Sequence, residues 1–209
     1  PWSLFVMFRL LFLIALLQFH QPVFSTEDTV SQAVARYLTR IHKYMEEEDW
    51  INAKRELEVT ARRYFKNEDS YERALINQLY GQFYALQRDY KNAIPWFEKA
   101  IAKGRLPFAA DLQVSYSLAQ CYFQTGRYKD VIGTLENYRD KASKRGQNMA
   151  PIQLMLLGIA YYQEQDTLNA YLNIAEANAT ATKLNEEWLQ YEFALAVKLE
   201  KYDDAVRVG

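Results

Sequence analysis

Few residues of this 209-residue chain have types and spacings suited to chemistry. The two histidines, His20 and His42, have no cysteine or second histidine at a metal-ligand spacing. The single cysteine, Cys121, excludes an intrachain disulfide and a thiolate zinc cluster, and its place on an apolar helical face favours a packed core residue. No nucleophile-elbow, phosphate-loop or zinc-protease motif occurs. We therefore expect a protein that is not an enzyme and that uses neither a metal nor a cofactor.

The densest group of carboxylates is the acidic run at residues 46–49. Such a run suits either a cation site or a solvated turn between two helices. We favour the turn, because Asp49 directly precedes an apolar periodic segment and can cap it. The other carboxylates spread over outer helical faces as solvated charge. Asn178, Ala179 and Thr180 form a glycosylation sequon, which has meaning only in a eukaryotic secretory pathway.

The composition indicates an ordered, all-α protein. Half of the residues are hydrophobic and 24% are charged, with 16 Tyr but only 7 Gly and 5 Pro. Few helix breakers and many aromatic residues at helical spacings favour helices throughout. The formal net charge of -1 provides no strong field for nucleic acid or for an anionic membrane surface.

Residues 1–25 have the layout of a secretory signal peptide. Arg9 supplies a short basic start, residues 10–17 are apolar, and Ser25 offers a small residue at the cleavage point. We expect the mature chain to begin at Thr26 and to be periplasmic. The alternative is an uncleaved N-terminal membrane anchor, because residues 1–17 together approach the ~20 residues of a spanning helix.

The stretch 71–107 has the pattern of two amphipathic helices joined by a tight turn, at residues 71–86 and 90–103. Pro95 either lies in the first turn of the second helix, with Asn92 as its cap, or kinks that helix. Comparable pairs are expected at 112–124 with 128–144 and at 152–163 with 168–181. One such pair cannot bury its apolar faces alone, so it needs neighbours of the same kind.

These pairs repeat. The residues that open the second helices are Trp50, Tyr90, Tyr128, Thr167 and Tyr202, spaced by 40, 38, 39 and 35 residues. Small and aromatic residues recur at fixed offsets from them, and this pattern resembles the tetratricopeptide repeat (TPR). The signature positions that carry the resemblance in the central repeats are Gly81, Tyr84, Ala93, Phe97, Ala119, Tyr122, Gly158, Tyr161 and Ala170.

The resemblance implies a right-handed α-solenoid of antiparallel helix pairs over residues 26–209, with about five repeats. The fifth is truncated at Gly209, so we expect the natural protein to continue. The period exceeds the usual value of about 34 residues, which leaves the superhelical pitch open. The resemblance also places the first helix of each pair along a concave, partner-binding groove. The expected groove residues are Gln78, Gln82, Gln113, Tyr116, Gln120, Phe123, Met155 and Tyr162.

Glutamine and aromatic side chains in a groove suit an extended peptide or a partner helix. The Lys and Asn pairs of the family's carboxylate clamp are missing, because Gln78, Gln82 and Tyr116 stand in those places. The signal peptide, the lengthened repeats and the run 71–101 are similar to periplasmic TPR proteins that accompany bacterial TonB energy-transduction systems. This similarity implies a non-enzymatic scaffold that binds envelope proteins. The alternatives are the repeat domain of a larger envelope-assembly or polysaccharide-export protein, with a catalytic or membrane part beyond residue 209, and a membrane-anchored scaffold.

Overall fold

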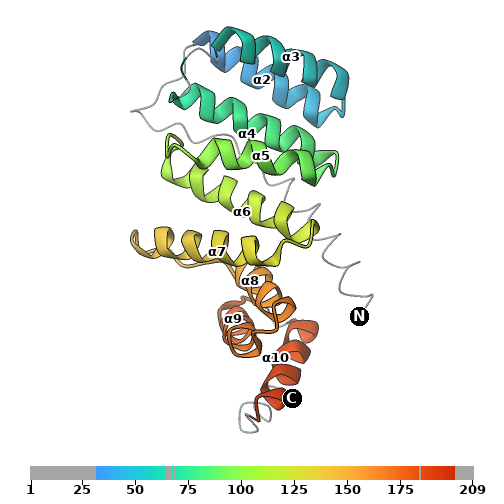
Figure 1. Ribbon diagram of the computed structural model, residues 1–209, viewed down its shortest axis with the longest axis vertical. Helices are drawn as coiled ribbons and strands as arrows, with labels where there is room; N and C mark the ends of the chain where they lie inside the picture. Colours follow the sequence, from blue (N-terminus) through green and yellow to red (C-terminus); the bar gives the residue numbers. More distant parts are fainter. Residues whose placement is uncertain (1–31, 65–66, 68, 184, 201–209) are drawn as a thin grey trace. The chain divides into compact units, whose positions relative to one another are not determined.

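The computed structural model describes residues 32–64, 67, 69–183 and 185–200, and within these ranges the chain forms nine α-helices and no strand (Figure 1). This confirms the predicted all-α class. The signal-peptide prediction, with His20 and Thr26, and the predicted second helix of the fifth repeat lie outside the described residues. The helices are α2 (Gln32–Glu46), α3 (Trp50–Tyr64), α4 (Tyr71–Leu86), α5 (Tyr90–Ile101), α6 (Phe108–Gln124), α7 (Tyr128–Ser143), α8 (Pro151–Gln163), α9 (Thr167–Thr180) and α10 (Glu186–Lys198).

The chain divides into two compact units, and the division falls inside α6, between Cys121 and Tyr122. In the first unit α2 pairs with α3, α4 pairs with α5, and α3 also packs against α4 (Figure 1). In the second unit α8 pairs with α9, while α7 packs against α8 and α10 packs against α9. Each unit is therefore built from helix pairs that follow one another along the chain, as the repeat pattern predicts.

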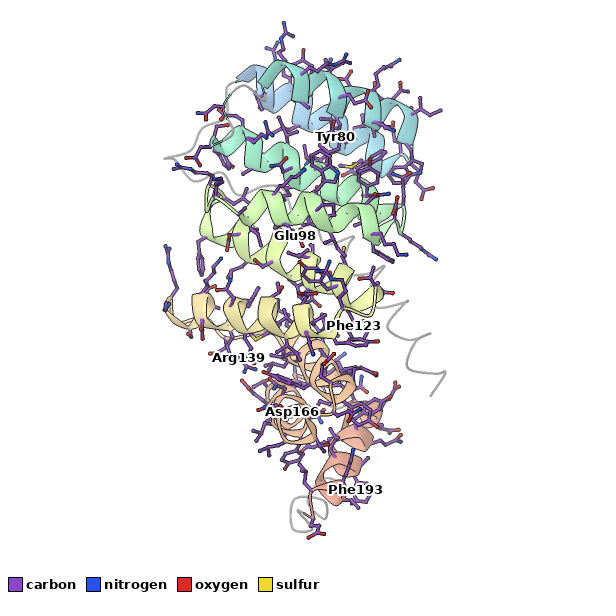
Figure 2. All side chains as sticks on the ribbon, in the orientation of Figure 1. Tyr80, Glu98, Phe123, Arg139, Asp166 and Phe193 are labelled. Atoms are coloured by element: carbon purple, nitrogen blue, oxygen red, sulfur yellow. The ribbon has the colours of Figure 1, made fainter. Side chains whose placement is uncertain are left out.

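A shared local motif forms the turns inside the helix pairs. An aspartate caps the second helix by accepting a hydrogen bond from the backbone N–H three residues later, at 3.1, 3.3 and 3.1 Å. The residue before each aspartate adopts the left-handed conformation, with φ of 55°, 62° and 66°. The capping pairs are Asp49 with Asn52, Asp89 with Asn92, and Asp166 with Asn169 (Asp166 is labelled in Figure 2). The sequence prediction identified only the first of these caps.

In the turn before α7 a basic residue takes the place of the capping aspartate. Gly126 takes the left-handed position with φ of 74°, and Arg127 stands where the other turns have aspartate. Arg127 Nε donates to Asp130 Oδ2 at 2.7 Å, so a salt bridge holds the first turn of α7. The guanidinium also lies 4.4 Å from the ring centre of Tyr122, a distance typical of a cation–π contact.

Pro95 corrects one local prediction. It is the sixth residue of α5, and Asp89 rather than Asn92 is the cap, so Pro95 does not lie in the first turn. The proline has no N–H for the carbonyl of Lys91 and leaves one helical bond unmade. Its side chain is exposed while Ala93 and Phe97 beside it are fully buried, so the ring lies on the outer side of α5.

The signature residues lie where paired helices approach each other closely. A Cβ atom added to Gly158 would lie 2.7 Å from Ile174 Cγ1 and 3.1 Å from the carbonyl oxygen of Ala170. Ala93, Ala119 and Ala170 are completely buried. Because only small side chains fit at such approaches, these residues determine how closely the helices of each pair pack. Tyr84 and Tyr161 are half-buried beside them, and Tyr122 is buried.

Candidate protein-interaction surfaces

Two of the first helices, α4 and α8, are enclosed on almost every side. In α8 every residue from 154 to 160 is buried, and in α4 every residue from 74 to 85 is buried except Gln78 and Tyr84, which are half-buried. A helix with one open face would show exposed residues every three or four positions. These helices therefore offer less open surface to a partner than a wide concave groove would.

This enclosure corrects part of the predicted groove. Met155 is 0% exposed, Gln82 3% and Gln120 7%. Side chains packed to this degree cannot contact a partner without unfolding of their surroundings. The prediction that these three residues line an open groove is therefore wrong, because packing against neighbouring elements covers the helix face that the repeat pattern leaves open.

The other predicted groove residues keep some exposed surface. In the first unit Gln113 is exposed, while Gln78 and Tyr116 are half-buried. In the second unit Tyr162 is 48% exposed and Lys198 Nζ lies 5.5 Å from its ring centre. Phe123, labelled in Figure 2, is half-buried and makes an edge-on contact with Tyr128, with ring centres 5.4 Å apart. The alignment of these residues along one stripe stays a prediction.

Three enclosed polar atoms of the first unit have no hydrogen-bond partner among the residues that the structure describes. They are Oδ1 of Asn77, Oε1 of Gln78 and Oγ of Ser115. Burying an acceptor without a donor costs about 1–3 kcal/mol, so such atoms usually pair with water or with a ligand. Asn77 and Ser115 occupy the same repeat position, four residues before Gly81 and Ala119, where the next repeat has Leu154. Sequence reasoning missed these two residues, and this polar-for-apolar exchange is the signal that could have identified them.

A stack of side chains also escaped the sequence prediction. The rings of Tyr80 and Trp96 stack with centres 4.3 Å apart, and Lys99 Nζ lies 4.6 Å from the ring centre of Trp96. Tyr80 is labelled in Figure 2. Burial, reinforced by the negative charge of Glu58, raises the pKa of the Tyr80 hydroxyl to about 12. The stack therefore joins α4 to α5, with a neutral phenol against the indole of Trp96 and the exposed ammonium group of Lys99 near that indole.

A polar network joins three helices of the second unit around Arg139, which Figure 2 labels on α7. Its guanidinium lies 3.3 Å from Glu136 and 3.8 Å from Glu176, and it donates to Oδ1 of Asn173. Tyr161 donates from its hydroxyl to Glu136 at 3.0 Å. Burial, together with this hydrogen bond and the Glu136 charge, raises the pKa of Tyr161 to about 12.

The candidates for chemistry lie in packed surroundings. Burial lowers the pKa of His42 against the opposing effect of Glu46, so its imidazole favours the neutral form. Burial raises the pKa of the Cys121 thiol to about 12, which leaves almost no thiolate at neutral pH. In the described part of the chain, no three His, Cys, Asp or Glu residues are grouped as metal ligands would be. Among the helices that the structure describes, none is both long and apolar enough to cross a membrane.

Comparison with known proteins supports the repeat fold. A model of the family "Anaphase-promoting complex, cyclosome, subunit 3" matches residues 86–148, which is less than a third of the chain. No curated protein sequence matches.

Several solved structures have the same fold at low sequence identity. MamA from Desulfovibrio magneticus RS-1 is 18% identical with a TM-score of 0.65, over 86% of this chain and 93% of its own. The apo form of RapI is 12% identical with a TM-score of 0.66, over 84% and 67%. A putative kinesin light chain of Podosopora anserina with nearly identical TPR-like repeats is 16% identical with a TM-score of 0.62, over 84% and 91%.

The fold and these similarities define a class: the chain is an α-helical repeat protein made of antiparallel helix pairs. Within that class its repeats are tetratricopeptide-like, as the matched family model and the TPR-like solved structures indicate. Proteins of this kind generally act as protein–protein interaction scaffolds and not as catalysts.

Proposed function

We propose that this chain is a non-enzymatic scaffold that is exported to the cell envelope and binds an extended segment of another protein. The observation that carries the proposal is Gln78. It lies at a predicted groove position of α4 and is half-buried, and its enclosed amide oxygen has no donor among the residues that the structure describes. An extended peptide carries a backbone N–H at almost every residue, and such a group is a suitable donor for this oxygen.

Tyr116 supports the same reading. It occupies the groove position of α6 that corresponds to Gln78 in α4, and its ring is partly exposed in the same unit. A partly exposed ring contributes apolar contact area at a small entropic cost, which is why tyrosine is frequent among residues that dominate binding energy. An amide acceptor and a ring at equivalent repeat positions fit a peptide whose main chain and side chains are both contacted.

The signal-peptide layout of residues 1–25 supports export, and the similarity of residues 71–101 to TonB-associated repeat proteins supports a finer assignment. In that assignment the scaffold is periplasmic and works with the proton-driven motor and TonB. An uncleaved anchor, or a larger envelope-assembly or polysaccharide-export protein, would use the same binding surface.

The test combines location and capture. Fractionation and N-terminal sequencing should find soluble periplasmic protein that begins at or near Thr26, whereas membrane protein with intact Arg9-containing peptides would contradict cleavage. Pull-down from envelope extract, quantified by mass spectrometry, should recover TonB-system components. The double variant Gln78→Leu, Tyr116→Ala should reduce that recovery about 30-fold, equivalent to the 2 kcal/mol typical of hot-spot residues. Lys91→Ala, an exposed change on α5, is the control.

The melting temperature of each variant separates binding from folding. Unchanged recovery by the double variant at an unchanged melting temperature would remove these positions from the binding surface. Reduced recovery together with a large fall in melting temperature would assign Gln78 and Tyr116 to packing instead.

A further inference from the structure

The outer face of α9 is apolar. Leu168 and Leu172 are each 49% exposed, Ala175 is half-buried and Ala179 is exposed. Spacings of four, three and four residues place all four on one side of a helix. The opposite side carries the buried residues Ala170, Ile174 and Ala177, which pack into the core of the second unit. Helix α9 thus has apolar residues on its outer as well as its inner face.

The other described second helices differ at these positions. The four outer residues lie one, five, eight and twelve places after the first residue of the helix. Each of the other three helices has at least one charged residue there, whereas α9 has none. The sets are Ile51, Arg55, Glu58 and Arg62 in α3; Lys91, Pro95 and Glu98 in α5, with Ala102 directly after it; Lys129, Gly133, Glu136 and Asp140 in α7; and Leu168, Leu172, Ala175 and Ala179 in α9.

This face is also short of charge at its edges. Glu176 is the single charged residue within the fourteen residues of α9. Its carboxylate lies 3.8 Å from the guanidinium of Arg139, which partly neutralises it. Contiguous apolar surface with little free charge is a common feature of interaction sites, and this face has both properties.

We propose that this face binds a second copy of the chain, with the two α9 helices antiparallel about a two-fold axis. In the register that centres the axis between Ile174 and Asn173, Leu168 lies opposite the partner's Ala179, and Leu172 lies opposite the partner's Ala175. Each large side chain then meets a small one. The two-fold axis makes every such contact occur twice, once from each copy. A parallel arrangement would set leucine against leucine and alanine against alanine, which leaves gaps beside the alanines.

The charges at the ends of α9 fit the same arrangement. Glu164 lies three residues before the first residue of α9, and the exposed Lys183 lies three residues after its last. An antiparallel pair brings each Glu164 to the end of the partner helix where Lys183 lies, and it sets the two helix dipoles in opposite directions. Glu164 also lies 3.9 Å from Lys129 within its own chain, so Lys183 of the second copy would add to an existing pair.

The interface rests on one helix from each copy. Four side chains per copy fall short of the roughly 1,000 Å² that a stable biological interface buries. The proposed dimer is therefore weak, and it forms where the protein is concentrated or is held by other partners. This association is independent of the binding surface in the first unit.

The test is sedimentation velocity of the purified protein, used in the processed form that the producing cell makes. Its concentration is varied from about 10 µM to about 1 mM, the range in which a small interface dissociates. The wild type should shift from monomer to dimer across this range, and Leu172→Glu should remain a monomer throughout. Ile51→Glu is the matched control, because Ile51 is an 82% exposed residue at the repeat position of Leu168 and should leave the shift unchanged. Circular dichroism should show equal helix content in all three.

Charge reversal tests the register. Lys183→Glu and Glu164→Lys should each weaken association several-fold, and the double variant should restore it. A monomer at about 1 mM, or a Leu172→Glu variant that still dimerises, would overturn the proposal. If both single variants and the double variant associate as strongly as the wild type, the antiparallel register is wrong.

Discussion

A Cβ atom added to Gly81 in α4 would lie 2.5 Å from Cδ1 of Phe97 in α5. Phe97 is fully buried, so its ring cannot move aside without displacing other core side chains. The hydrogen at Gly81 is therefore what lets α4 and α5 pack at their observed separation. Two signature residues of the repeat, Gly81 and Phe97, thus determine the separation of two paired helices in the first unit.

We predict that Gly81→Ala destabilises the protein although alanine is the better helix former. Alanine should add about 1 kcal/mol of helix propensity, but the clash with Phe97 should outweigh that gain and lower stability by about 1–3 kcal/mol. The matched control is Gly133→Ala, because a Cβ atom at Gly133 in α7 meets nothing within 4 Å. Urea unfolding should show a decrease for the first variant and an increase of up to about 1 kcal/mol for the second. Equal increases in both would show that Phe97 adapts freely.

The helix pairs could be predicted from the sequence because their determinants are local. Apolar spacing, the small residues and Asp49 each act within one helix or one turn, and the structure shows helices at the expected places. The caps at Asp89 and Asp166 are equally local, and aligning the turns with one another would have revealed them. Before α7 the Arg127–Asp130 salt bridge stands in place of the aspartate cap. A search for aspartate at the capping position therefore misses this turn.

The candidate binding surface was predicted less well, because exposure depends on contacts between repeats. Gln82 and Gln120 are polar, and the residue type alone favours an exposed position, yet both are buried. Whether a groove position stays open depends on how closely successive first helices pack, and no single residue encodes that distance. The apolar face of α9 was visible in the sequence, since Leu172 stands where the other second helices have Arg55, Pro95 or Gly133, but the pattern also fits a buried helix.

Cys121 should make stability depend on pH in alkaline solution. Burial raises the pKa of its thiol from 9.0 to about 12, so the folded state keeps a proton that the unfolded state loses. The resulting stability is fully present below pH 9 and is lost as the pH rises towards 12, by about 1.4 kcal/mol per pH unit. Tyr80 and Tyr161, whose pKa values rise from 10.0 to about 12, should add to the loss above pH 10.

The measurement is urea unfolding of the wild type and of Cys121→Ala at pH 7, 9, 9.5 and 10. The variant should be less stable at pH 7, because the removed sulfur leaves a small cavity. Its stability should then fall less steeply than that of the wild type between pH 9 and 10. Parallel curves would mean that the thiol gains access to water or a compensating cation in the folded state.

Asn178 should be a structural residue and not a glycan acceptor. Its Nδ2 atom donates to the carbonyl oxygen of Trp188 at 3.1 Å and to Oε2 of Glu192 at 2.9 Å, which ties α9 to α10. Glu192 is only 3% exposed, so losing this donor leaves a buried carboxylate less well satisfied. Asn178→Ala should therefore lower stability by about 1–3 kcal/mol, while Asn137→Ala, at an exposed site on α7, should change it by less than about 0.5 kcal/mol. A double-mutant cycle with Glu192→Ala should give a coupling of about 0.5–3 kcal/mol, and strictly additive effects would contradict the direct bond.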